Sequence, residues 1–215
     1  RMTHSSRRLR SDFKLLQRLA IIEKQLGEMV GDITKEIRFP SDPADVVECL
    51  ALLGQACLLA HGISNLRRSP SHELLNGLQR VANVMGAFER DLTRAKADDA
   101  VEELLEMIEE SANAIDGHFD RFQEYLSRYS EDDWLPTLEL YQALSTRRKV
   151  EFCRIALVEM GMSDDVPDLL NRIRRFDGYY AQVFAPYDVG LKPIPGLPRA
   201  KHEWWTRRPR DRRSE

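Results

Sequence analysis

The stretch DPADVVECLALLGQACLLAHGISNLRR, residues 42–68, decides the fold of this chain. It opens with Asp42 and Pro43, a favourable N-cap and first-turn pair for a helix. The run that follows is apolar on most sides of a helix, and it contains Glu48, Gln55 and His61. A helix that is hydrophobic all round lies in the centre of a protein or in a membrane. Because polar side chains interrupt the run, we predict a buried central helix and no membrane span.

A second long helix is predicted before this stretch, over about residues 9–37. Its apolar residues alternate spacings of four and three, which is typical of a coiled-coil seam. The seam consists of Leu15, Leu19, Ile22, Leu26, Met29 and Ile33. Gly27 and Gly31 lie one turn apart, and we expect them to allow another helix to approach closely.

Two more long helices are predicted after the central one. The first begins at Ser69-Pro70-Ser71, and its apolar residues are Leu74, Leu78, Val81, Met85, Phe88 and Leu92. The second begins after Asp98-Asp99 and runs to about residue 129, with acids in its first turn, where the helix dipole favours them.

Four long helices with short connections predict an all-α protein, with an antiparallel four-helix bundle over residues 1–129. Shorter helices packed on the bundle are expected over residues 130–184, at about 137–144, at 145–161 and from 163 onward. Proline and glycine recur after residue 184, so residues 185–215 are predicted to form an extended, basic tail.

Charge is distributed unevenly, although the net charge is only -3. Residues 98–133 hold thirteen acids and two basic residues. Residues 1–18 hold six Arg or Lys and one acid, and residues 199–213 hold seven and two. An acidic middle between basic ends favours contacts between segments or with charged partners.

The three cysteines, Cys49, Cys57 and Cys153, fall in apolar helical patterns. We expect buried free thiols, because their spacing suits neither a disulfide framework nor a zinc site. The first residues lack the apolar core of a signal peptide. These features predict a cytoplasmic protein, or one of another reducing compartment.

The sequence carries no recognisable catalytic motif, since it lacks a Walker loop, a G-x-G-x-x-G turn and a G-x-S-x-G elbow. His61 lies in the most apolar helix, where a buried, hydrogen-bonded histidine is expected. Neither His61 nor His118 has a glutamate three residues before it, as two-metal carboxylate bundles have. We therefore predict no enzymatic activity, no metal and no cofactor.

Three cations, Arg147, Arg148 and Lys149, follow Ser145-Thr146, which is predicted to cap a helix. The helix dipole disfavours cations in a first turn, whereas a bound anion would reverse that effect. One interpretation is therefore a site for an anion or an acidic partner. The other, which we favour, is that these side chains reach the nearby acids at 131–133.

The tail contains KHEWWTRRPRDRRSE, residues 201–215. Arginine with aromatic residues is typical both of single-strand binding and of protein interfaces. Because the acidic middle of the chain attracts the tail and repels phosphates, we favour a protein contact. Its expected binding residues are Trp204, Trp205, Arg207, Arg208 and Arg210.

These features predict a non-enzymatic interaction or scaffold subunit that binds protein partners, or further copies of itself. The surfaces expected to bind are the seam of the first helix, the acidic helix at 98–129 and the Trp/Arg tail. An alternative is a nucleic-acid-associated protein that uses its basic ends, Arg7, Arg8, Arg10 and residues 207–213. A second alternative is a small-ligand or enzymatic pocket near His61.

Overall fold

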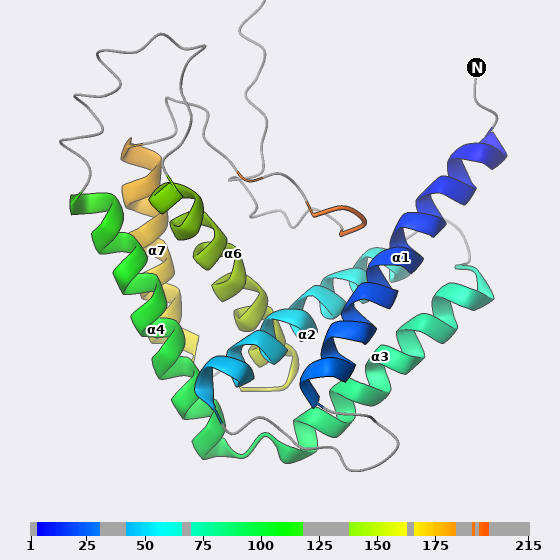
Figure 1. The fold of residues 1–215 in the computed structure, drawn as a ribbon, viewed down its shortest axis with the longest axis horizontal. Coiled ribbons are helices and arrows are strands. Elements are labelled where there is room, and N and C mark those ends of the chain that lie inside the picture. Colours follow the sequence, from blue (N-terminus) through cyan, green and yellow to red (C-terminus); the bar gives the residue numbers. More distant parts are fainter. Residues whose placement is uncertain are drawn as a thin grey trace, which may run out of the picture.

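The computed structural model describes residues 4–30, 42–65, 70–117, 138–162, 166–183, 191 and 194–197. Within these ranges all regular structure is helical and there is no strand, which confirms the all-α prediction. The helices are α1 (His4–Val30), α2 (Pro43–Ser64), α3 (His72–Asp91), α4 (Arg94–Gly117), α6 (Leu138–Glu159) and α7 (Val166–Val183) (Figure 1).

The helices form two groups, α1 with α3 and α4 with α6 and α7, and α2 lies between them (Figure 1). The most extensive helix–helix contact in the described chain joins α2 to α6. Consecutive helices alternate in direction, so α2 runs against α1 and α3, and α6 runs against α4 and α7. One core therefore includes helices from both sides of residue 129.

The pairing of α4 differs from the expected bundle of the first four long helices. Its main contacts are with α7, α6 and α2, and it diverges from α3 (Figure 1). The apolar stripe of α4 is buried, and it includes Val101, Leu104, Ile108 and Ile115. A stripe identifies the face of a helix that must be covered, but it does not identify the helix that covers it.

The central helix α2 is buried along most of its length, as predicted. Its buried residues are Val46, Val47, Cys49, Leu50, Ala51, Leu52, Leu53, Gly54, Gln55, Ala56, Cys57, Leu59 and Ile63. By length and composition it is the one helix in the described ranges that meets the criteria for a membrane span, and 72% of its most apolar window is covered by the rest of the protein.

α2 and α6 approach each other closely at Gly54. A Cβ atom placed on Gly54 would overlap the carbonyl oxygen of Phe152 and lie 2.8 Å from the Phe152 Cα atom. Because the neighbour is backbone rather than a flexible side chain, there is no space for any other residue at this position.

Local capping signals position several helix ends. Asp42 caps α2 by accepting a hydrogen bond from the Ala44 N–H at 2.9 Å, and Ser71 caps α3 through the Leu74 N–H at 3.3 Å. α6 is followed by Gly161 at φ +75, with hydrogen bonds from Gly161 N to Val158 O and from Met162 N to Leu157 O. This pattern is a Schellman motif.

The start of α4 was predicted too late in the chain. α4 begins at Arg94, and the preceding Thr93 side chain accepts a hydrogen bond from the Lys96 N–H at 3.3 Å. Thr93 therefore acts as the N-cap. Asp98 and Asp99 lie beyond the first turn, so their charges are not explained by the dipole at the start of this helix.

We expect Asp42→Ala to lower the free energy of unfolding by about 1 kcal/mol, because it removes the acceptor that caps α2. Asp42→Asn keeps a capping oxygen and should change the stability much less. Urea unfolding of both variants checks this. If Asp42→Ala and Asp42→Asn lost the same free energy of unfolding, the capping oxygen at position 42 would contribute nothing to stability.

The seam of α1 is buried within the chain itself. Leu19, Ile22 and Leu26 are almost inaccessible, and α1 contacts both α2 and α3. Gly27, in contrast, has nothing within 4 Å of the position that a Cβ atom would take, so the predicted close approach of a helix at this residue is wrong. Gly31 lies outside the described residues.

The described part of the C-terminal segment turns back onto α1. Leu197 N donates to Ile194 O at 3.2 Å, and Gly196 has φ +80, so Pro195 and Gly196 form the centre of a tight turn. Leu191, Ile194 and Leu197 pack against the core. The extended conformation predicted for the tail is therefore wrong at residues 194–197.

Candidate functional site

The predicted anion site at residues 145–149 does not lie at a helix start. α6 begins at Leu138 and continues through Ser145 and Thr146, so the prediction of a helix break there is wrong. The helix-interior N–H groups are already bonded within the helix. Neighbouring Leu144 and Val150 are buried, and burial of one continuous helix face outweighs the local capping preference of Ser and Thr.

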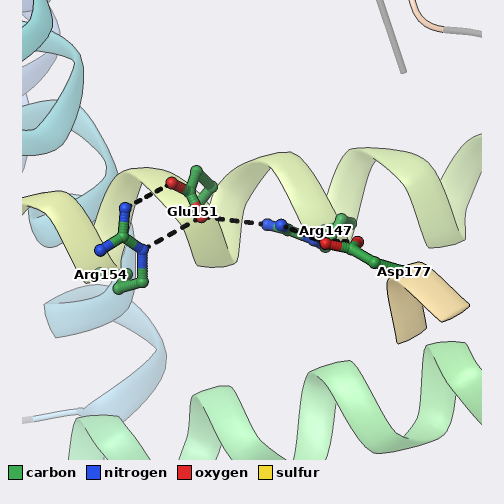
Figure 2. A network of polar contacts seen from close by, with 4 residues as sticks. All are labelled: Arg147, Glu151, Arg154 and Asp177. Carbon is green, nitrogen blue, oxygen red and sulfur yellow. Dashed lines mark hydrogen bonds and ion pairs between the residues drawn. The ribbon is translucent and has the colours of Figure 1, made fainter. Parts of the chain in front are cut away.

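Arg147 instead belongs to a buried ionic network between α6 and α7 (Figure 2). Its side chain is 3% exposed. Arg147 Nε and Nη2 donate to the two carboxylate oxygens of Asp177 at 2.8 and 3.0 Å. Arg147 Nη1 donates to Glu151 Oε2 at 3.2 Å. Planar, bidentate pairing of this kind is the strongest geometry available to arginine and a carboxylate.

Arg154 completes the network from the next turn of α6. Its Nη2 and Nε donate to the two oxygens of Glu151 at 2.6 and 3.2 Å. Two guanidinium groups thus face two carboxylates, Glu151 and Asp177, and the four charges cancel (Figure 2). A buried charge is tolerated when it is paired and hydrogen-bonded in this way.

The network changes the ionisation of its members. Burial by itself would raise the pKa of Glu151, but the hydrogen bonds and charges of Arg154 and Arg147 outweigh burial and the pKa is lowered. The hydrogen bond to Glu151 raises the pKa of Arg154. Both groups are therefore held in their charged forms, and neither has the properties of a general acid or base at neutral pH.

Sequence reasoning singled out Arg147 but missed Glu151, Arg154 and Asp177. A signal for two of them was present, because Arg147, Glu151 and Arg154 are spaced by four and three and share one face of a helix. Nothing local in the sequence pairs this face with Asp177, thirty residues further along the chain.

Lys149 also has a partner within the chain. Its ammonium group pairs with Glu48 of α2. The acids at 131–133, which were expected to receive these cations, lie outside the described residues. Arg148 is half-buried and takes part in contacts within the chain. Arg147 and Lys149 thus connect α6 to α7 and α2.

His61 is on the surface, and the expectation that it is buried is wrong. Its side chain is 62% exposed, and Nε2 lies 3.0 Å from Glu159 Oε1 at the end of α6. The reason is its position in the last turn of α2, where the helix emerges from the core beside Asn65.

The cysteines are buried and free, as predicted. Burial raises the pKa of the Cys57 thiol to about 11, and the nearby charge of Glu159 contributes. Burial likewise raises the pKa of Cys49 to about 12 and that of Cys153 further. Thiols with such values are poor nucleophiles at neutral pH. No group of His, Cys, Asp and Glu with metal-binding geometry occurs among the residues described.

The outer face of α4 carries the acids of the predicted acidic helix. Asp99, Glu102, Glu106 and Glu110 are all exposed. None of them belongs to an ion pair in the described part of the chain. Glu109, on the flank, behaves differently because it pairs with Arg172 of α7 and lies 3.9 Å from Arg175.

The proposed anchors of the tail, Trp204, Trp205, Arg207, Arg208 and Arg210, lie outside the described residues. The nearest described part of the tail is the turn at residues 194–197, where Gly196 lies against α1.

Comparison of the chain with protein-family models, curated proteins and solved structures gives no match, so its function has to be argued from these contacts and charges.

Proposed function

We propose that the chain is a non-enzymatic interaction subunit whose helical body presents charged surfaces to protein partners. The observation that carries this proposal is the outer face of α4, where exposed carboxylates have no cationic partner within the described ranges.

Three features of α4 support the proposal. The inner face of the helix is buried against α6 and α7, so the helix is held rigidly. The outer acids at 99, 102, 106 and 110 follow helical spacing, which aligns them in one row. A row of uncompensated carboxylates on a fixed helix favours a basic partner through charge complementarity.

The chain's other proposed contact is the tail, with Trp204 and Trp205 as anchors and Arg207, Arg208 and Arg210 giving orientation. A further copy of the chain is one partner that the opposite charges of α4 and the tail fit. The seam of α1 is not part of the proposal, because its leucines and isoleucine are occupied within the core.

We expect a fluorescein-labelled decalysine peptide to bind the purified chain and to bind Glu102→Gln/Glu106→Gln/Glu110→Gln at least about tenfold more weakly, because three carboxylates are lost. Glu73→Gln/Glu89→Gln, on the exposed surface of α3, is the matched control and should bind normally. Fluorescence anisotropy at low salt measures the affinities.

Both variants should unfold at the wild-type urea concentration, since the changed residues are exposed and make no ion pair with the described residues. Equal peptide affinity for the wild type and the α4 variant would contradict the proposal.

A further inference from the structure

Helix α3 carries an apolar stripe that the rest of the described chain leaves partly uncovered. The stripe consists of Leu75, Leu78, Ala82 and Met85, which are spaced by three and four and therefore share one face of the helix. Leu75 is 47% exposed and Ala82 is also exposed. Leu78 and Met85 are half-buried, so each presents part of its side chain to solvent. We call these four residues the α3 stripe.

The α3 stripe is open because α3 lies at an edge of the helical body (Figure 1). Among the described helices α3 contacts α1 and, less extensively, α2, and α4 diverges from it. Leu74, Val81 and Phe88, on the adjoining face of α3, are buried in the core. The core therefore occupies one face of α3 and leaves the α3 stripe available to another protein surface.

The α3 stripe fits a second copy of itself. In an antiparallel pair of α3 helices, Leu75 faces Met85 of the second copy and Leu78 faces Ala82, because the two pairs share the same midpoint in the helix. Gly86, next to Met85, is half-buried and has nothing within 4 Å of the position of a Cβ atom. It leaves space beside the α3 stripe that the exposed side chain of Leu75 fills. Large side chains thus meet small ones or open space, as interlocking helices require.

The ends of the α3 stripe are complementary in charge in the same register. Glu89 continues the spacing one turn beyond Met85, and it faces Ser71, the N-cap of α3 in the second copy. Glu89 is exposed and belongs to no ion pair within the described ranges. The positive end of a helix dipole attracts a carboxylate. Two-fold symmetry gives this contact twice, as in any isologous interface.

We propose that two copies of the chain associate through the α3 stripe, with their α3 helices antiparallel about a two-fold axis. Burial of the exposed apolar side chains stabilises the dimer. Residues 75–89 extend over about 21 Å, so one pair of helices buries less than the roughly 800 Å² per partner of a standard interface. The dimer is therefore reversible, with a Kd in the micromolar range. This interface goes beyond the contact proposed for α4 and uses a different helix.

Sedimentation velocity of the full chain, at concentrations from about 1 to 200 µM, measures the association. We expect the weight-average mass to rise from that of the monomer toward twice that value. The association should persist at about 0.5 M salt, because the burial of apolar surface is not screened by ions. A dimer held by charges between α4 and the tail would dissociate at this salt concentration.

Two substitutions place a charge in the interface. Leu75→Glu and Gly86→Lys should each weaken the dimer by about tenfold or more, because the new charge loses its water in an apolar contact. Ile21→Glu, at a 39% exposed residue of α1, is the control for the first. Gly178→Lys, in α7 with nothing within 4 Å of its Cβ position, is the control for the second. Both controls should dimerise as the wild type does.

Mixing the two interface variants tests the antiparallel register. Positions 75 and 86 lie side by side across the proposed interface, so the introduced carboxylate and ammonium groups attract each other in the mixed dimer. An equimolar mixture of Leu75→Glu and Gly86→Lys should therefore associate about tenfold more tightly than either variant alone. Fluorescence-detected sedimentation, with one variant labelled, measures the mixed species.

Three results would overturn the proposal: a monomer at every concentration, undiminished association of Leu75→Glu, or a mixture that associates no better than its components. Loss of the dimer in Ile21→Glu alone would place the second copy on α1 instead. Circular dichroism melting at about 1 µM establishes that each variant is folded, and the open positions of both residues predict wild-type melting. Glu102→Gln/Glu106→Gln/Glu110→Gln should dimerise normally, so the proposals for α3 and α4 fail independently.

Discussion

Gly54→Ala is expected to lower the free energy of unfolding by at least about 3 kcal/mol, although alanine is ordinarily the better residue in a helix. The added methyl group meets the backbone of Phe152, so α2 and α6 have to move apart. These two helices form the most extensive contact of the described chain, and their separation opens the centre of the core. Overpacking against backbone leaves no rotamer that relieves the overlap.

Gly27→Ala is the matched control, because this glycine is also in a helix but has nothing within 4 Å of its Cβ position. Here the ordinary helix preference should prevail and raise the stability by up to about 1 kcal/mol. Urea unfolding followed by circular dichroism measures both variants. A Gly54→Ala chain as stable as the wild type would show that the two helices are not in close contact in solution.

The two glycines also show what the sequence reveals and what it leaves open. Gly27 and Gly31 were expected to mark a close helix approach because they lie one turn apart, whereas the approach occurs at the solitary Gly54. A glycine has no side chain and so leaves room beside its helix. The neighbouring residues in the sequence do not show whether another helix packs into that room. Interior packing depends on pairs of helices distant in the chain, such as α2 and α6.

Sequence patterns within a single helix turn predicted the structure more reliably than features that depend on residues far apart in the chain. Asp42, Ser71 and Gly161 end or begin helices as predicted, because a cap involves residues within one turn of each other. The break predicted at Ser145-Thr146 failed because capping residues are tolerated inside a helix when the rest of its face is buried.

The same contrast between local and long-range features applies to the candidate site residues. Arg147 was recognised as unusual from its position alone, but its partner Asp177 lies in another helix, and so its role was misjudged. The tail was recognised as basic and aromatic, whereas the turn that attaches it to α1 depends on a contact between residues 14 and 196.

Glu151→Gln is expected to lower the free energy of unfolding by about 3–5 kcal/mol at neutral pH, because it breaks a buried ionic network from its centre. Glu151 is the carboxylate that Arg147 and Arg154 share. The glutamine keeps the shape of the side chain but removes the negative charge. Of the two carboxylates of the network, only that of Asp177 then remains to balance the charges of Arg147 and Arg154. An isosteric change thus isolates charge from packing.

Glu23→Gln is the control, since Glu23 also pairs with an arginine, Arg80 at 2.8 Å, but on the surface. Exposed pairs of this kind contribute about 0.2–1 kcal/mol. In urea unfolding at neutral pH, Glu151→Gln should therefore lose several times more free energy of unfolding than Glu23→Gln. Similar losses would mean that the network around Arg147 is not buried in solution.

The pH dependence gives an independent measurement of the same network. The pKa of Glu151 in the folded chain is below its ordinary value of 4.5. A carboxyl group with a lowered folded pKa contributes stability above its unfolded pKa and loses it as the pH falls through the folded value. The wild type should therefore lose stability faster than Glu151→Gln on acidification below about pH 4.5, and the difference between them should shrink. If the free energy of unfolding changed with pH in the same way for both chains, the lowered pKa of Glu151 would be contradicted, because Glu151 is the only titrating group that the substitution removes.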